Sequence, residues 1–171
     1  VSVRDIFSKT VSEWMKGTGP DRDIAIGSRV RLARNVAGIP FPAVASPSQL
    51  EQVCAMARKA VQNGTGLTAQ LEYQDMAQLT PLERQLLVER HLISPQHAQN
   101  PKHRAVLIRD DESVSVMINE EDHFRIQAIT PGMQPEAAWK LCSQVDEALE
   151  QQLDFAFSER RGYLTACPTN V

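Results

Sequence analysis

The sequence predicts an α+β fold in which a mainly antiparallel sheet is flanked by helices. Residues 103–108 and 114–118 are apolar, strand-like segments joined by a short charged turn, which is typical of a β-hairpin. Two other segments carry helix-start signals followed by apolar residues at the helical period. Because hairpins and helices are mixed along the chain, the α+β class fits best. The length of 171 residues alone would suit one domain.

The composition indicates a globular chain with few possible classes of partner. Hydrophobic residues make up 42% and charged residues 23% of the sequence, so we expect a core that needs no disulfide or metal. The net charge of −3 and the aromatic content of 5% predict no direct nucleic-acid partner. No apolar run is long enough to span a bilayer, and the N-terminus lacks a secretory signal, so no membrane association is expected.

The cysteines indicate a reducing compartment, which we take to be the cytoplasm. Cys54, Cys142 and Cys167 form an odd set without CxxC spacing, so we expect free thiols. Cys54 and Cys142 lie on apolar helix stripes and are assigned to the core. Cys167, beside a proline at a strand end, is the candidate for a partly exposed, reactive thiol.

The first elements are a leading helix and a strand. Apolar residues at helical spacing predict a short amphipathic helix within residues 1–20, which glycines and Pro20 end; these are Val3, Ile6, Phe7, Val11 and Trp14. Residues 24–32 then alternate, and this pattern predicts a strand with one buried side. Ile24, Ile26, Val30 and Leu32 would occupy that side.

Two helices have clear N-terminal signals. Ser46 can cap a helix whose first position is Pro47, and Gln49 completes a capping box. Apolar residues follow at the helical period until the glycines at positions 64 and 66. Thr80 begins the same signal again, for a helix ending near residue 90 or 91.

The remaining elements complete the predicted sheet. After the hairpin, Phe124, Ile126 and Ala128 alternate with polar residues and predict another strand. Residues 135–153 have a helical apolar stripe and predict a long helix. Residues 162–166 predict a short final strand.

An arginine pair is the first candidate site. Arg29 and Arg31 would share one strand face, roughly 7 Å apart along the strand. Two planar guanidinium groups at that spacing could hold adjacent phosphoryl groups of one nucleotide. From the pattern alone, the solvated outer face of an edge strand is the preferred interpretation.

The second candidate site is the acidic run that precedes the strand predicted from Phe124. Glu120, Glu121 and Asp122 are consecutive, and such carboxylates are costly together unless they are solvated or paired with cations. If the apolar residues face inward, Glu121, His123, Arg125 and Gln127 share the other face. That face could hold a basic substrate beside an anionic cofactor, although an acidic turn is again the preferred interpretation from the pattern alone.

Other site patterns are missing from the sequence. No HExxH motif or paired His/Cys spacing occurs, so no dedicated metal site is expected. No GxxxxGK[ST] or GxGxxG loop occurs either. A nucleotide site would therefore have to use side chains instead of a glycine-rich loop.

Three motifs together resemble the phosphagen kinase family. They are SRVRLARN with GIPFP close behind it, NEEDHFRI, and GYLTACPTN, and they occur in the family's order. Arginine and creatine kinases resemble this sequence only after a helical domain of their own, whereas here 28 residues precede Arg29. That layout resembles the bacterial branch of the family that phosphorylates arginine side chains in proteins.

The resemblance implies a set of roles around ATP, with Mg²⁺ held mainly through the phosphates. Glu121 would be the catalytic carboxylate, Glu120 would support it, and Cys167 would be the active-site cysteine. His91 matches the family's histidine near the nucleotide base. The phosphate-binding residues would be Gly27, Ser28, Arg29, Val30, Arg31 and Arg125.

The resemblance also implies that residues 1–171 are the N-terminal part of a catalytic domain. In the family, CPTN is followed by a Gly-Thr-Gly stretch and further phosphate-binding arginines, whereas this sequence ends at Val171. We therefore expect part of the ATP site to be missing and the fragment to be inactive alone. Exposed strand edges would favour self-association, such as a homodimer.

Further partners are implied by the resemblance alone. They are protein substrates with exposed arginines, including a stress-response repressor, an adaptor that activates the kinase, and a link to a Clp protease. Two alternatives stay open. One is a non-catalytic module that binds a nucleotide or phosphoarginine, and the other is a kinase for small guanidino compounds.

Overall fold

The computed structural model describes residues 11–167, 169 and 170. Most of the predicted leading helix lies outside these residues. Its described part contains the 3₁₀ helix η1 (Glu13–Lys16), which ends at Gly17 in a left-handed conformation. Trp14 of this turn is half-buried, so the segment is attached to the rest of the molecule.

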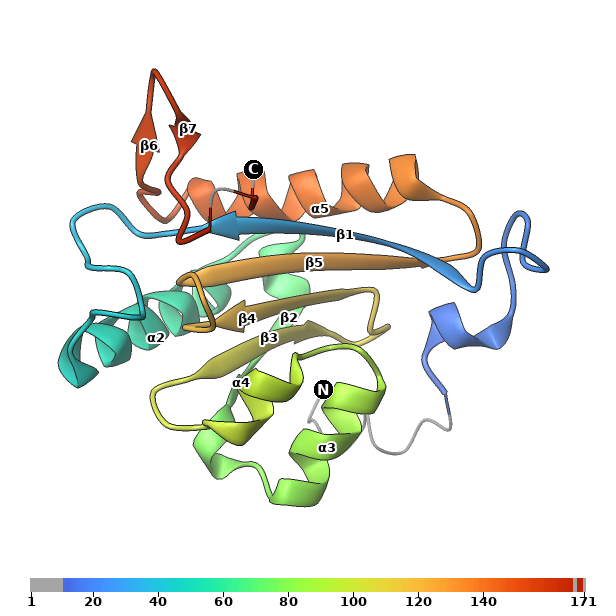
Figure 1. Ribbon diagram of the computed structural model, residues 1–171, viewed down its shortest axis with the longest axis horizontal. Helices are drawn as coiled ribbons and strands as arrows, with labels where there is room; N and C mark the ends of the chain where they lie inside the picture. The colour runs from blue at the N-terminus through green and yellow to red at the C-terminus, as the bar shows by residue number, and fades with distance from the viewer. Residues whose placement is uncertain (1–10, 168, 171) are drawn as a thin grey trace.

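Five antiparallel strands form the central sheet, as the α+β prediction required. The strand order is β1-β5-β4-β3-β2, so within the described residues β1 and β2 lie at the two outer edges. Figure 1 shows the long strands β1 and β5 side by side across the molecule. The strands are β1 (Gly27–Arg34), β2 (Leu71–Asp75), β3 (Ala105–Arg109), β4 (Val114–Ile118) and β5 (Phe124–Pro131).

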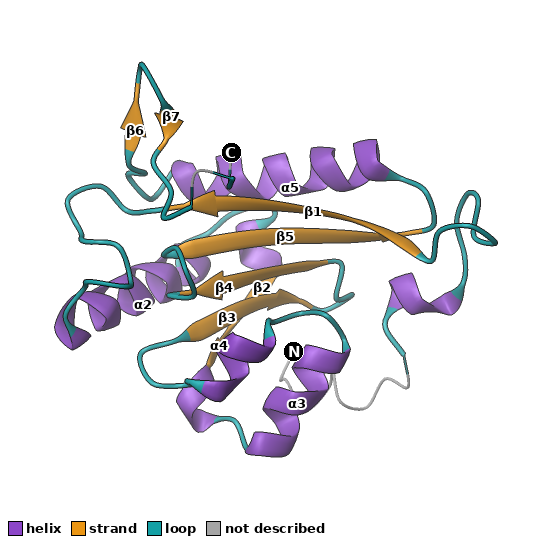
Figure 2. Ribbon diagram, in the orientation of Figure 1, coloured by secondary structure: helices purple, strands orange, loops and turns teal. Residues whose placement is uncertain are grey.

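Helices cover both faces of the sheet, but unequally. The long helices α2 (Pro47–Gln62) and α5 (Pro135–Glu150) pack their apolar stripes on one face and enclose the main core with strand residues such as Leu32 and Ile126. The shorter helices α3 (Pro81–Glu89) and α4 (Pro95–Gln99) cover only the β3–β4 part of the other face, around Met117. Figure 2 shows these two short helices in front of the lower strands. These two helices do not cover the β1–β5 part of that second face, where η1 packs against β5 and Arg29 and Arg31 remain exposed.

The two helix-start predictions are confirmed in detail. The Ser46 side chain accepts a hydrogen bond from the Gln49 amide, and the Gln49 side chain accepts one from the Ser46 amide. Thr80 and Glu83 form the same reciprocal pair at α3. The hairpin and the strand from Phe124 are also present, although β3 begins at Ala105 instead of residue 103.

Several predicted boundaries were wrong. The strand predicted for residues 24–32 begins only at Gly27, because backbone hydrogen bonds to the Asp21 carbonyl turn the chain before it. Ile24 and Ile26 are consequently 85% and 66% exposed instead of buried. The final strand β7 (Gly162–Tyr163) is shorter than predicted.

Five elements were not predicted from the sequence. They are β2, α4, the 3₁₀ helices η2 (Thr68–Gln70) and η3 (Met76–Gln78), and β6 (Phe157–Ser158), which pairs with β7 in a separate two-stranded sheet. The helix α5 ends at Glu150, a little before the predicted residue 153. These differences leave the fold class unchanged.

The cysteine predictions have mixed outcomes. All three thiols are free. Cys142 is fully buried, and burial raises its pKa to about 12. Cys54 is only half-buried at the margin of the core, so its assignment to the core was partly wrong; burial still raises its pKa to about 11.

Among the described residues, no helix is long and apolar enough to cross a membrane.

Candidate active site

The uncovered part of the sheet carries three arginines. In the antiparallel register Ala33 pairs with Arg125 and Arg31 pairs with Gln127, so all four side chains share one face with Arg29. Desolvation and the positive charges of Arg29 and Arg125 lower the pKa of Arg31 below its ordinary value. No carboxylate of the described residues lies within ion-pair distance of Arg29 or Arg31. This surface is therefore a ready site for a multiply charged anion.

The other residues of the predicted phosphate segment lie differently. Ser28 and Val30 face the opposite side of the strand, and the Ser28 hydroxyl donates to the Gly132 carbonyl (2.9 Å) while accepting from the Gln134 amide (2.8 Å). Their side chains are thus not brought to the arginines. At Gly27 a Cβ would approach the Thr130 carbonyl oxygen to 2.9 Å, so glycine permits the close start of this strand pair.

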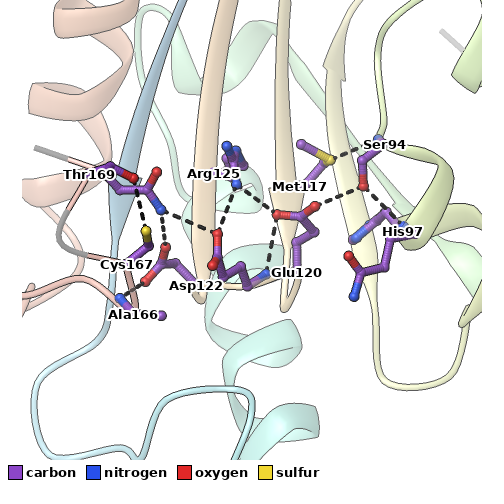
Figure 3. A network of polar contacts seen from close by, with 12 residues as sticks. Ser94, His97, Met117, Glu120, Asp122, Arg125, Ala166, Cys167 and Thr169 are labelled. Atoms are coloured by element: carbon purple, nitrogen blue, oxygen red, sulfur yellow. Dashed lines mark hydrogen bonds and ion pairs between the residues drawn. The ribbon is translucent and has the colours of Figure 1, made fainter.

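The acidic run forms the loop between β4 and β5, and Glu120 is its most firmly held member. Its carboxylate accepts hydrogen bonds from the Ser94 hydroxyl (2.8 Å), the Arg125 guanidinium (3.1 Å) and the Glu121 amide (3.2 Å), as Figure 3 shows. Burial alone would raise its pKa, but these bonds and the charge of Arg125 outweigh it and leave the pKa lowered. Glu120 therefore stays ionised and fixes the direction of Arg125.

Glu121 is the freer carboxylate of this loop. Its side chain is 49% exposed, and its Oε2 lies 3.4 Å from Nη1 of Arg125 and 3.4 Å from Nδ2 of Asn170. These long contacts leave acceptor capacity for a further donor. The structure thus places an available carboxylate directly beside an arginine, as the shared-face hypothesis expected for this pair.

Asp122 ties the predicted cysteine to the same loop. Its buried carboxylate accepts hydrogen bonds from Asn35 Nδ2 (2.6 Å), the Ala166 amide (2.6 Å) and Asn170 Nδ2 (3.2 Å). Cys167, half-buried, follows Ala166, and its Sγ lies 2.9 Å from the Thr169 hydroxyl. Segments separated by more than forty positions therefore meet at the acidic loop.

His123 does not join the Arg125 face, so that part of the shared-face prediction was wrong. Its Nδ1 accepts from the Val36 amide (3.1 Å), which leaves Nε2 as the donor to the Pro40 carbonyl (3.1 Å). Burial lowers its pKa, so the ring is a neutral structural link. The reason is position: His123 precedes β5 and faces the chain that follows β1.

His91 is brought to the arginine face by its backbone. It follows α3 with a positive φ of 59°, its side chain is exposed, and its ring meets Trp14 edge-on at 5.3 Å. Gln127, the strand partner of Arg31, donates to the His91 carbonyl at 2.6 Å. The predicted base-side histidine and the predicted phosphate-side arginines thus border one surface.

Three residues position this site in ways that the sequence reasoning did not predict: Ser94 was not named, and Asp122 and Gln127 were named only as members of the acidic run and of the shared face. Ser94 orients Glu120, Asp122 holds the cysteine segment, and Gln127 connects His91 with the Arg31 strand. Ser94 did carry a signal, because Ser94-Pro95 repeats the helix-start pattern seen at Ser46 and Thr80. The other two act through partners far away in the sequence.

The arginine face can bind a multiply charged anion such as the phosphate chain of a nucleoside triphosphate. The three arginines can neutralise phosphate oxygens, and two of them have no competing carboxylate among the described residues. No group of three metal-ligating side chains occurs in the described part of the chain. A magnesium ion at this surface would be coordinated mostly by phosphates and water.

Comparison with known proteins places the chain in a family. A model of the ATP:guanido phosphotransferase C-terminal catalytic domain matches residues 52–171. A protein-arginine kinase of Symbiobacterium thermophilum is 50% identical over 169 residues, 98% of this chain and 48% of that protein. A protein-arginine kinase of Moorella thermoacetica is 51% identical over 162 residues, covering 94% and 46%.

A solved structure agrees with these sequence matches. The duplicated taurocyamine kinase of Schistosoma mansoni, determined with bound transition-state analogue components, has a TM-score of 0.77 and 27% identity over 84% of this chain and 21% of its own. The chain spans about half the length of the curated relatives that it matches. Because the family model covers most of its residues, the chain belongs to the ATP:guanido phosphotransferase, or phosphagen kinase, family, within the catalytic domain.

Proposed function

We propose that this chain belongs to an enzyme that phosphorylates arginine side chains of proteins with ATP. The observation that carries the proposal is the meeting of Glu121, an available carboxylate, with Arg125 and the arginine pair of β1 on one open surface. A guanidinium and a phosphoryl donor need opposite charges side by side, and this surface offers both. The names of the relatives that are about half identical support proteins as the acceptors.

The chain's own groups would divide the work. Arg29, Arg31 and Arg125 would bind and orient the phosphate oxygens and offset the charge that develops there. Bound ATP with Mg²⁺ would supply the phosphoryl group and further charge neutralisation. Since phosphoryl transfer depends mostly on positioning, the fixed direction of Arg125 on Glu120 would matter as much as its charge.

Glu121 would act on the acceptor. A guanidinium has a pKa above about 12 and is a poor nucleophile while it is charged. The Glu121 carboxylate would accept two of its N–H bonds and aim one nitrogen at the γ-phosphorus of ATP. It would take a proton from that nitrogen as the N–P bond forms and the bond from phosphorus to the leaving ADP oxygen breaks. Cys167 would border this position from the segment that Asp122 holds. The Glu120 carboxylate would remain ionised and support the arginine.

The wider setting is proposed on the same basis. Residues 1–171 would form the N-terminal part of the catalytic domain, would lack part of the ATP site and would be inactive alone. We also propose a cytoplasmic location, a stress-response repressor among the substrates, an adaptor as activator and a link to a Clp protease. Within the described residues the outer edges of β1 and β2 are unpaired, and we propose that they favour self-association.

The test is a phosphoarginine assay of the full-length protein that contains this chain. Glu121→Gln keeps the size of the side chain and removes the charge, so transfer should fall by about a thousandfold while ATP binding persists. Glu136→Gln on α5, which is exposed and distant from the arginine face, should change neither. Equal phosphoarginine formation by the Glu121 variant would refute the proposed role.

Two alternatives have distinct signatures. A binding module would give tight, salt-sensitive ATP binding by this chain alone in calorimetry, with no transfer by the full-length protein. A small-molecule guanidino kinase would turn over free arginine at least as fast as protein arginine.

A further inference from the structure

A cavity of about 730 Å³ opens beside the acidic loop, away from the arginines of β1. Glu120, Glu121 and Arg125 line one side of it, and the loop that joins α4 to β3 lines another. Because Glu121 is the carboxylate proposed to hold the acceptor guanidinium, the cavity is where the rest of an acceptor would lie. The side lined by the α4–β3 loop would therefore meet the residues that flank the acceptor arginine.

This side of the cavity forms a cationic wall. It carries Lys102 and Arg104, with the amide side chains of Gln96 and Asn100 beside them. Arg104 is half-buried, and its Nη1 donates to the Gln96 carbonyl at 2.8 Å. No carboxylate of the described residues lies within ion-pair distance of Arg104 or Lys102.

Unpaired cations in a cavity have few structural uses. Burial lowers the pKa of Arg104, so holding its charge there has a cost that nothing in the described structure offsets by an ion pair. The negative charge of Glu120 acts on it, yet that carboxylate is already engaged by Ser94 and Arg125. The open donors of Arg104 and the exposed Lys102 ammonium point to an anionic ligand group.

The spacing between the two walls is fixed by shared contacts. Asn119, the residue before Glu120, donates from Nδ2 to the His103 carbonyl at 2.8 Å and to the Leu50 carbonyl at 2.9 Å. Asn119 and His103 both have positive φ, at 61° and 56°, so the two loops are shaped around this bond. The cationic wall therefore lies at a fixed position relative to the carboxylates of the acidic loop.

We propose that this wall makes the enzyme prefer acceptor arginines that have an acidic residue beside them in the sequence. The proposal rests on the proposed function and extends it from the transfer step to the choice of substrate. With the acceptor guanidinium on Glu121, a neighbouring Asp or Glu carboxylate would meet Arg104 and Lys102, and a neighbouring Lys or Arg would be repelled. A free arginine could present its own α-carboxylate to the same wall, so the test must separate the two.

The experiment compares peptides that differ at one flanking position. The full-length protein phosphorylates matched peptides with Glu, Gln or Lys next to a single acceptor arginine, and phosphoarginine is measured as kcat/KM. We expect the Glu peptide to exceed the Lys peptide by about tenfold, the size of one favourable charge contact replaced by repulsion. Arg104→Glu should invert this order, because it replaces the cation by an anion.

Two further variants, at exposed residues, keep the test valid if Arg104→Glu fails to fold. Lys102 is exposed, so Lys102→Glu leaves the core intact and should reduce the preference by a few-fold. Lys140→Glu, on the exposed side of α5, makes the same charge change far from the cavity and should leave the order of the peptides unchanged.

The outcomes separate the two proposals. Phosphoarginine formed equally on all three peptides, with no change in Arg104→Glu and Lys102→Glu, would overturn the preference but leave the kinase function. A fall in kcat/KM that these variants show only with free arginine as the acceptor would overturn the preference as well, because the wall would then bind the α-carboxylate of free arginine. No phosphoarginine on any acceptor would overturn the proposed function, and the preference with it.

Discussion

Two groups of arginines in this molecule have opposite surroundings. Arg34 is buried, lies 2.5 Å from Asp146 and stacks over the Tyr163 ring at 3.6 Å. Arg90 is likewise buried, 2.6 Å from Glu112. Ser12 also donates to that carboxylate and so fastens the segment before η1 to the hairpin turn. These arginines have fully enclosed partners and connect elements of the fold.

Arg29, Arg31 and Arg104 form the contrasting group. None has a carboxylate within ion-pair distance among the described residues. Arg29 and Arg31 are exposed on β1, and Arg104 lines the cavity beside the acidic loop. A cation that is paired and enclosed holds structure together, whereas a cation kept without a partner is available to a ligand. Among these five arginines, burial and pairing therefore distinguish those that hold the fold together from those that remain available to a ligand. Arg125, which is paired with Glu120 but lies on the arginine face, stands between the two groups.

The largest effect on stability should come from breaking an enclosed pair. Arg34→Leu leaves Asp146 buried without its cation and removes the stacking on Tyr163, so the free energy of unfolding should fall by about 3–5 kcal/mol in urea titration. The double variant Arg34→Leu/Asp146→Leu should lose clearly less, because no uncompensated charge remains. A loss below about 1 kcal/mol for the single variant would contradict the contrast.

An enclosed histidine should give the next largest effect, and it depends on pH. Burial lowers the pKa of His97 from 6.5 to about 4, while its Nε2 bonds the Ala105 carbonyl at 3.0 Å. Since the folded pKa lies below the unfolded one, its contribution is present above pH 6.5 and lost as the pH falls through 4. That loss amounts to about 3 kcal/mol.

His97→Gln keeps a donor for the Ala105 carbonyl but removes the titration. Its free energy of unfolding should therefore decline less steeply than that of the parent between pH 6.5 and 4. Identical slopes for the parent and the His97 variant would refute the buried, neutral state of this side chain.

For Arg29, Arg31 and Arg104, we expect a substitution to change ligand binding more than stability. Arg31→Gln removes a cation that Arg29 and Arg125 already repel, so stability should change by less than about 0.5 kcal/mol. Affinity for ATP in calorimetry of the full-length protein should fall by about 10- to 100-fold, and its salt dependence should weaken. A stability loss without a change in affinity would move Arg31 to the structural group.

The parts of the fold that were predictable are those with local signals. The capping boxes at Ser46 and Thr80 and the short turn of the hairpin depend on neighbouring residues, and all three were found. By contrast, β2 has only Leu71 and Tyr73 as apolar residues and becomes a strand because it pairs with β3. Ile24 and Ile26 continue an alternating pattern past the point where the chain turns away from the sheet.

The candidate site likewise has parts that local sequence signals predicted and parts that they did not. The alternation of β1 placed Arg29 and Arg31 on one face, because strand geometry is local. The family motifs led to Glu120, Glu121 and Cys167, but the contacts that hold them involve Ser94 and Asn170, which no local pattern connects. The cationic wall of Arg104 and Lys102 had no sequence signal, because it becomes part of a cavity only when its loop lies beside the acidic loop in the fold.

The smallest effect should come from a third kind of arginine, one that is paired but near the surface. Arg109 binds Asp111 with two hydrogen bonds, at 2.8 and 2.6 Å, in the hairpin turn, where the Asp111 side chain is 40% exposed. Arg109→Gln should reduce the free energy of unfolding by less than about 1 kcal/mol, because water solvates the released carboxylate and Ser113 still donates to it. If this loss equalled that of Arg34→Leu, pairing alone would set the energetic role of an arginine. The expected gap of several-fold between the two variants would instead assign that role to burial.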